Sequence, residues 1–165
     1  MNPFRWPFRI QCLAGFLVCA GLLAYAYYVQ FGMGIEPCPM CIFQRIVFIL
    51  LGIVFLVGAI HGPALVGRRV YGATLGLIAC IGVGIAARHI WIQHQPPNPF
   101  AGCGPGLNYM VANFTWSKTL QMAFTGSADC AKISHTILGL SMPEWALISF
   151  FLLGAGGAWA GWRRR

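Results

Sequence analysis

The chain has 165 residues, of which 58% are hydrophobic and 8% are charged, and its formal net charge at pH 7 is +8. A water-soluble domain of this length rarely carries so few charged side chains, so the composition indicates an integral membrane protein surrounded by lipid. The surplus of basic residues is therefore interpreted as membrane topology, and nucleic acid is not expected among the partners.

Four apolar stretches come close to the ~20 residues that a membrane-spanning helix requires. Three of them contain no charged residue, and the fourth carries Gln44 and Arg45 in its first turn. We therefore expect an all-α membrane protein in which four helices form an antiparallel transmembrane bundle, as a single domain over residues 1–165. The expected helices cover about residues 10–31, 42–60, 70–91 and 144–162.

A cleavable signal peptide is the alternative interpretation of the first stretch. Arg5 and Arg9 precede it, and residues 24–26 (Ala-Tyr-Ala) resemble a small-residue cleavage site. The stretch is longer than a usual signal core, however, and it continues past this site. Cleavage would also leave an odd number of spans and would place Arg68 and Arg69 on the outer side. We therefore interpret the stretch as a retained helix.

Basic residues gather on one side of the expected bundle. With both termini on that side, seven of the 11 Lys and Arg residues flank the membrane there, in the short segments where the positive-inside rule applies best: Arg5, Arg9, Arg68, Arg69, Arg163, Arg164 and Arg165. The three acidic residues fall on the opposite side: Glu36, Asp129 and Glu144. The rule predicts cytoplasmic termini and two outward loops, at about residues 32–41 and 92–143.

The second expected helix opens on a Cys-Pro-Met-Cys motif, from Cys38 to Cys41. A C-x-x-C pair at a helix start is a redox or metal device, because both sulfurs lie on one turn. Pro39 suits the first helical position, and the helix N-terminus adds partial positive charge that stabilises a thiolate. The motif therefore predicts a reactive thiol at the membrane surface.

Arg45 follows Cys41 by one helical turn, on the same face, and adds a full positive charge. The alternative is an arginine that snorkels to the interface as an anchor. An arginine facing the bundle needs a partner, because at full depth it would cost ~2.5–3.5 kcal/mol. We expect the Cys41 thiolate to be that partner.

Seven cysteines divide between the outward loops and the apolar stretches. Cys12, Cys19 and Cys80 lie inside apolar stretches, where we expect small core residues. The outward four are Cys38, Cys41, Cys103 and Cys130. Two outward pairs suggest disulfides in an oxidising compartment. Four cysteines allow three pairings, and close spacing favours Cys38–Cys41, which would leave Cys103–Cys130.

The long outward loop contains strong helix breakers, in the Pro-rich residues 95–100 and the Gly-rich residues 102–106. Between its two cysteines, apolar residues recur at helical spacing: Leu107, Met110, Val111 and Phe114. This spacing fits a short helix on the membrane surface, and equally a folded polar cap with a few buried apolar residues.

Several motifs together resemble the disulfide bond formation protein B (DsbB) family. They are Cys-Pro-Met-Cys-Ile-Phe-Gln-Arg at 38–45, Arg-His-Ile-Trp-Ile-Gln at 88–93, Cys-Gly at 103–104, Gly-Ser-Ala-Asp-Cys at 126–130 and Leu-Gly-Leu-Ser-Met-Pro-Glu-Trp at 138–145. The resemblance covers about residues 28–150, in the order expected of the family. Each motif alone is weak, whereas four cysteines so placed among four membrane helices are a specific signature.

The resemblance implies a bacterial inner-membrane enzyme that reoxidises a periplasmic thioredoxin-fold dithiol oxidase (DsbA-like) and passes the electrons to a membrane quinone, ubiquinone or menaquinone. It implies that the partner attacks Cys103, that the freed Cys130 attacks Cys38, and that Cys41 is released as the thiolate that meets the quinone. Arg45 would hold that thiolate and polarise a quinone carbonyl. No metal is implied.

The same resemblance places His89, and with it Gln93 one turn further on, at the quinone site. From the sequence alone, a single histidine near a helix end is more often an interfacial anchor. Arg88 is interpreted as such an anchor.

Other classes of protein explain less of the sequence. A vitamin K epoxide reductase-like enzyme also couples loop cysteines to a quinone, but its redox pair lies late in the chain. A structural zinc site could use Cys38, Cys41, Cys103 and Cys130. A b-type haem protein needs paired histidines at membrane depth, where only His89 is expected.

Overall fold

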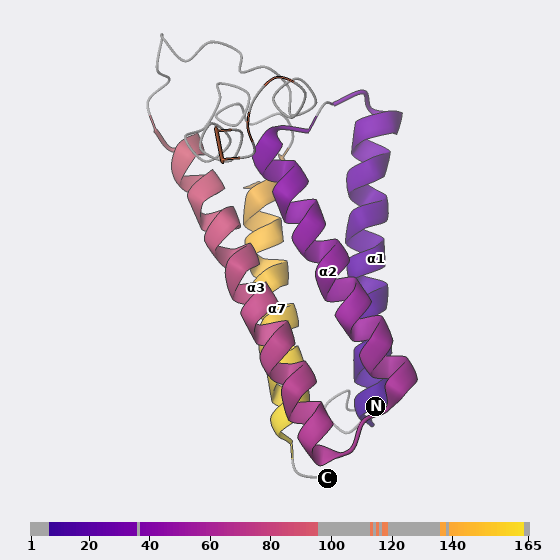
Figure 1. Ribbon diagram of the computed structural model, residues 1–165. Coiled ribbons are helices and arrows are strands. Elements are labelled where there is room, and N and C mark those ends of the chain that lie inside the picture. Colours follow the sequence, from indigo (N-terminus) through magenta and orange to yellow (C-terminus); the bar gives the residue numbers. More distant parts are fainter. Residues whose placement is uncertain are drawn as a thin grey trace.

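The computed structural model describes residues 7–35, 37–95, 113, 115, 117–118, 136–137 and 139–163. Within these residues, four helices are long and apolar enough to cross a membrane: α1 (Phe8–Gly32), α2 (Pro39–His61), α3 (Leu65–Gln93) and α7 (Met142–Trp162). They alternate in direction, so that α1 begins and α7 ends at the same end of the bundle (Figure 1). The expected four-helix transmembrane bundle is therefore confirmed.

Each helix extends beyond its expected bounds at one end or both. The largest difference is in α3, which begins at Leu65 rather than at about residue 70 and so includes Arg68 in its first turn. The Arg68 side chain donates a hydrogen bond from Nε to the carbonyl oxygen of Pro63, 3.1 Å away. The helix therefore extends beyond the apolar stretch to include Arg68, whose side chain hydrogen-bonds to the turn before α3.

The turn between α2 and α3 depends on one glycine. Gly62 ends α2 in the left-handed conformation, with φ of 56°, and its N–H bonds the Gly58 carbonyl. Glycine adopts this conformation without steric cost, and Pro63 then prevents the helix from continuing. At the same end, Arg9 of α1 donates from Nε to the Ala59 carbonyl, 2.8 Å away. The first two helices are therefore tied at the end of the bundle where the chain reverses.

Small residues let α3 and α7 pack backbone to backbone. A Cβ atom added to Gly161 would lie 2.5 Å from the Arg68 carbonyl oxygen and 2.8 Å from the Cα of Gly72. Gly157 is similarly close to Leu75. By contrast, nothing lies within 4 Å of a Cβ added to Gly76. These glycines form two Gly-x-x-x-Gly pairs, Gly72 with Gly76 in α3 and Gly157 with Gly161 in α7. Three of the four therefore serve the contact, and Gly76 does not.

The core between the helices is filled by large apolar side chains. Leu51, Leu75 and Phe150 have no exposed surface, and Phe150 stacks on Phe48 with ring centroids 4.1 Å apart. The outer surface is apolar as well, and its exposed side chains include Leu17, Phe31, Val66 and Leu77. A soluble protein rarely exposes so much apolar surface, whereas lipid covers it in a membrane.

The cysteines inside the apolar stretches do not all lie in the core. Cys12 and Cys19 are buried, as expected, but Cys80 is exposed on α3. The expectation of a core role is therefore wrong for Cys80. An α3 that is apolar on every side gives no sequence signal of which face turns inward.

A two-residue hairpin precedes α7 and was not expected from the sequence. Strand β1 (Thr136–Ile137) pairs antiparallel with β2 (Leu140–Ser141), and Gly139 in the turn has φ of 83°. The Ser141 N–H then donates to Oε2 of Glu144, 2.5 Å away, which caps the start of α7. The hairpin therefore sets where the last helix enters the bundle.

Candidate active site

The two cysteines of the Cys-Pro-Met-Cys motif lie on the first turn of α2. Cys38 is the N-cap residue, with extended backbone angles, and Pro39 occupies the first helical position. The Cys41 N–H donates to the Cys38 sulfur across 3.4 Å. A serine or aspartate oxygen commonly fills this capping role, so the Cys38 sulfur accepts a hydrogen bond at the positive end of the helix.

The two sulfur atoms are 3.1 Å apart and are not joined by a disulfide bond. Cys38 is buried, with 8% of its surface exposed, whereas Cys41 is half-buried. The pair needs only a small movement to close into a disulfide, whose S–S bond is ~2.05 Å long. Of the two sulfurs, the one on Cys41 belongs to the more accessible residue.

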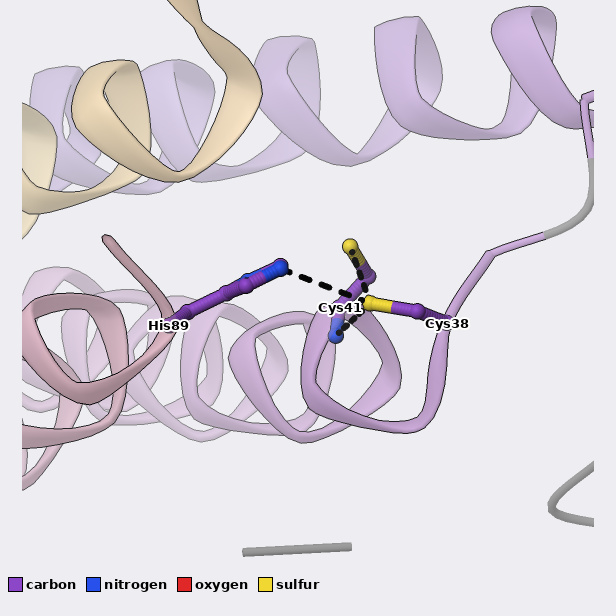
Figure 2. A group of neighbouring side chains, drawn as sticks. All are labelled: Cys38, Cys41 and His89. Atoms are coloured by element: carbon purple, nitrogen blue, oxygen red, sulfur yellow. Dashed lines mark hydrogen bonds between the residues drawn. The ribbon is translucent and has the colours of Figure 1, made fainter. Parts of the chain in front are cut away.

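His89 of α3 completes the cluster. Its ring points at the two sulfurs across the gap between α2 and α3 (Figure 2), and Nε2 lies 3.6 Å from the Cys38 Sγ. The side chain is almost fully buried, with 2% of its surface exposed. A buried histidine is costly unless its nitrogens are paired, and this buried side chain differs from an anchor that is exposed at the membrane interface.

Gln44 of α2 holds the other side of the imidazole. Its Nε2 lies 3.3 Å from Nδ1 of His89, and Gln44 is also buried, with 5% of its surface exposed. When the amide N–H donates to Nδ1, the ring proton lies on Nε2 and faces the Cys38 sulfur. The three side chains then form a directed chain, from the Gln44 amide through the His89 ring to the Cys38 sulfur.

Arg45 lies one turn beyond Cys41 and reaches toward α1. Its guanidinium donates to the Gln30 side-chain oxygen and, over 3.0 Å, to the Ala26 carbonyl. It also sits 5.2 Å from the centre of the Tyr27 ring. The expected partner was the Cys41 thiolate; the hydrogen bonds that fix Arg45 instead come from α1. A peptide carbonyl and an amide satisfy a half-buried guanidinium without a second charge.

The remaining predicted site residues lie apart from this cluster or outside the described residues. Gln93 is half-buried one turn beyond His89, and Arg88 is exposed beside it. Cys103 and Cys130 lie outside the described residues, as do the apolar residues proposed for an interfacial helix (Leu107, Met110, Val111 and Phe114). The described site therefore consists of the dithiol, His89 and Gln44, with Arg45 nearby.

Gln44 is the site residue that the sequence reasoning missed. The signal was present, since Gln44 is an uncharged polar residue inside an apolar stretch and lies three residues after Cys41. Residues three apart share a helix face, so a polar side chain there had to accompany the cysteine into the bundle.

Comparisons with known proteins identify the family of this chain. The family model described as "Disulfide bond formation protein DsbB" matches residues 8–160. Disulfide bond formation protein B of Xanthomonas euvesicatoria pv. vesicatoria is 49% identical over 166 residues, covering 100% of this chain and 96% of that protein. The Methylococcus capsulatus protein of the same name is 50% identical over 147 residues, covering 89% of this chain and 90% of its own. Disulfide bond formation protein B of Xylella fastidiosa is 44% identical over 164 residues, covering 99% of this chain and 95% of that protein.

Proposed function

The chain belongs to the disulfide bond formation protein B family and is a multi-pass membrane protein-disulfide oxidoreductase, and from this we propose the route that electrons take through it. A DsbA-like periplasmic dithiol enters at Cys103, and a membrane quinone receives the electrons beside Cys41. The observation that carries the proposal is the cluster in which Cys38 and Cys41, at the start of α2, meet the buried His89 of α3.

The route consists of thiolate–disulfide exchanges that balance at each step. The partner's thiolate attacks Cys103 of the Cys103–Cys130 disulfide, and Cys130 leaves as a thiolate. Cys130 then attacks Cys38 of the Cys38–Cys41 disulfide, and Cys41 leaves as a thiolate. The partner's second thiol releases Cys103, which attacks Cys130 and expels Cys38. The partner is now oxidised, and Cys38 and Cys41 hold its two electrons.

His89 acts at the step in which Cys38 leaves. Its Nε2 lies 3.6 Å from that sulfur, so an Nε2–H stabilises the negative charge that develops there. Burial strengthens this interaction, because water does not screen it. Gln44 is a positioning residue: it fixes the ring and its tautomer through Nδ1. The α2 N-terminus contributes through the Cys41 N–H, which already points at the Cys38 sulfur.

A quinone fits the surroundings of the dithiol, because the half-buried Cys41 packs against an apolar cluster that includes Met40 and Ile92, while the polar His89 lies within 4.8 Å of both sulfurs. When bound, the quinone, ubiquinone or menaquinone, supplies an acceptor for two electrons and two protons. Arg45 and His89 are the donors that would hold its carbonyl oxygens, and Gln93 lies on the same helix as His89. Arg45 is pre-positioned for this by its hydrogen bonds to α1.

We further propose the bacterial inner membrane as the location, with both termini cytoplasmic. Arg9 and Arg68 bond the turn at the end of the bundle where α1 begins, and the cysteine cluster lies at the other end. The positive-inside rule assigns the arginine end to the cytoplasm and the cysteine end to the periplasm.

The proposal is tested by mixing the detergent-solubilised protein with a reduced thioredoxin-fold dithiol and following quinone absorbance. Quinone reduction should require both dithiol partner and protein, and it should be lost in Cys38→Ser. Cys80→Ser is the matched control, because Cys80 is exposed on α3 and away from the cluster. Normal quinone reduction by Cys38→Ser would contradict the proposed route.

A further inference from the structure

The reduced cluster resembles a metal site as well as a redox site. One ligand atom from each of Cys38, Cys41 and His89 lies within 4.8 Å of the other two. Two thiolates and one imidazole are the ligands that zinc-class divalent cations prefer, and zinc sites with three protein ligands keep a fourth position open. Among the described residues, this is the group in which three possible metal ligands lie close enough together to bind one ion.

The distances come close to those of a tetrahedral site. Zn–S bonds of ~2.3 Å and Zn–N bonds of ~2.0 Å imply S–S separations of roughly 3.8 Å and S–N separations of roughly 3.5 Å. The sulfurs are 3.1 Å apart, and Nε2 of His89 is 3.6 Å from the Cys38 sulfur. The Cys41 sulfur lies within 4.8 Å of the His89 ligand atom. A cation would therefore enter after the sulfurs separate by less than an ångström and the Cys41 sulfur settles at roughly 3.5 Å from the imidazole nitrogen.

Gln44 supplies the outer partner that a metal-binding histidine needs. A ligating histidine usually donates its other ring N–H to an oxygen, which fixes the ring and raises its basicity. The Gln44 amide lies 3.3 Å from Nδ1 and carries both a donor and an acceptor. After the amide turns over, its oxygen accepts from Nδ1–H and leaves the Nε2 lone pair free for the metal. Gln44 can therefore hydrogen-bond to His89 both in its Nε2–H tautomer and in the Nδ1–H tautomer that binds a metal.

We propose that the reduced form of the site binds a zinc-class divalent cation through Cys38 Sγ, Cys41 Sγ and His89 Nε2. The two thiols release their protons to solvent, and the cation gains two thiolates and one imidazole without any change of oxidation state. The oxidised protein does not bind, because a disulfide sulfur carries no negative charge to offer. Metal capture goes beyond the proposed function and does not depend on it. The functional consequence of metal capture does rest on the proposed function: the bound cation blocks re-formation of the Cys38–Cys41 disulfide.

The experiment uses the full-length protein in detergent, carrying Cys103→Ser and Cys130→Ser so that the other outward thiols are absent. Cd²⁺ is the probe, because cadmium–thiolate bonds absorb in the ultraviolet, and Zn²⁺ is then added as a competitor. The reduced protein should bind one Cd²⁺ per chain, and Zn²⁺ should displace it. The same protein with its Cys38–Cys41 pair oxidised is the matched control, and it still contains Cys12, Cys19 and Cys80.

Two variants test the imidazole ligand. Gln44→Leu should weaken Cd²⁺ binding by about 10- to 100-fold, the usual effect of losing an outer partner. His89→Leu should weaken it further, whereas His94→Ala removes an exposed histidine of the same region and should change nothing. Equal binding by the oxidised protein would place the cation elsewhere and overturn the site. Unchanged binding by His89→Leu would show that the two thiolates alone bind the cation, and would contradict His89 as the third ligand.

The readout separates this inference from the proposed function. Cadmium absorbance reports binding without any partner or quinone, so it remains valid if the protein proves inactive in the quinone assay. The blocking effect is tested separately in the protein that keeps Cys103 and Cys130, reduced and loaded with one Cd²⁺. Quinone reduction that survives there would contradict the blocking effect while leaving the metal site intact.

Discussion

Gln44 and His89 are 45 residues apart in the sequence, yet the Gln44 Nε2 lies 3.3 Å from Nδ1 of His89 inside the bundle. Both side chains are almost completely buried, and the hydrogen bond joins α2 to α3 directly behind the dithiol. A buried polar pair at this depth is costly unless it is satisfied, so the two residues stabilise each other's placement. The reactive sulfurs therefore face an imidazole whose orientation is fixed.

This relationship predicts the effect of Gln44→Leu. Loss of the amide removes the hydrogen bond to the buried Nδ1, at a cost of about 1–3 kcal/mol. If the whole cost raises the barrier of the reaction at the dithiol, the rate falls by about 5- to 150-fold. Gln44→Glu keeps a hydrogen-bonding group at the position and should restore part of the rate. Quinone reduction at saturating dithiol partner is the measurement, with kcat and KM for quinone determined separately. Equal rates for the Leu variant and the unsubstituted protein would remove Gln44 from the mechanism.

His89→Leu should slow turnover more strongly, by about 100-fold, because a positioned acid–base group typically contributes at least that much. The Cys38 sulfur then has no imidazole to stabilise it as it leaves, and the Cys38–Cys130 mixed disulfide should accumulate. Acid quenching followed by mapping of disulfide-linked peptides detects that species. His94→Ala is the control, since His94 is exposed and bonds its own helix at the Ile90 carbonyl.

Arg45→Met tests whether the guanidinium acts on the dithiol and quinone or only ties α1 to α2. If it acts chemically, quinone reduction should fall by about tenfold or more while the helix content stays unchanged, and Arg45→Lys should retain part of the activity. Gln30→Leu removes a partner of Arg45 on α1 but keeps the charge. A Gln30→Leu protein as impaired as Arg45→Met would show that the α1 tie, rather than the charge, is what matters.

Substitution of Cys103 and of Cys130 should give two different outcomes with the dithiol partner. Cys130→Ser should trap the partner on Cys103 as an intermolecular disulfide, because no neighbouring thiol resolves it, whereas Cys103→Ser should capture no partner at all. Non-reducing gel electrophoresis after mixing with the reduced partner separates these cases. An impermeant maleimide should also label Cys103 and Cys130 in intact, reduced spheroplasts; labelling only after permeabilisation would invert the proposed topology.

Gly161→Ala should loosen the packing of α3 against α7. The added methyl group would lie 2.5 Å from the Arg68 carbonyl oxygen, so the helices must separate, at about 1–3 kcal/mol. Gly76→Ala is the matched control, because nothing lies within 4 Å of its added Cβ and alanine favours helix by ~1 kcal/mol. Thermal unfolding in detergent should give a lower midpoint for Gly161→Ala alone. Equal midpoints for the two variants would contradict the close contact.

The sequence by itself determined the four spans and the position of the dithiol. Each apolar stretch is long enough to cross a membrane, and such a stretch must be helical because lipid offers no partner to its backbone groups. Pro39 and the turn before it determined that α2 begins at the cysteines, so both sulfurs had to lie on one turn. These features are local, and local chemistry is enough to predict them.

The tertiary structure alone decided what surrounds the dithiol. The long apolar part of α3 has no polar face to mark its inward direction, so the rotation of α3 about its axis against α2 depends on packing. The packing places Gln44 on His89, turns Arg45 toward Gln30, and leaves Cys80 exposed. The contact of Gly161 with Gly72 sets how closely α3 and α7 approach each other. These relationships join residues far apart in the chain, and no local pattern determines them.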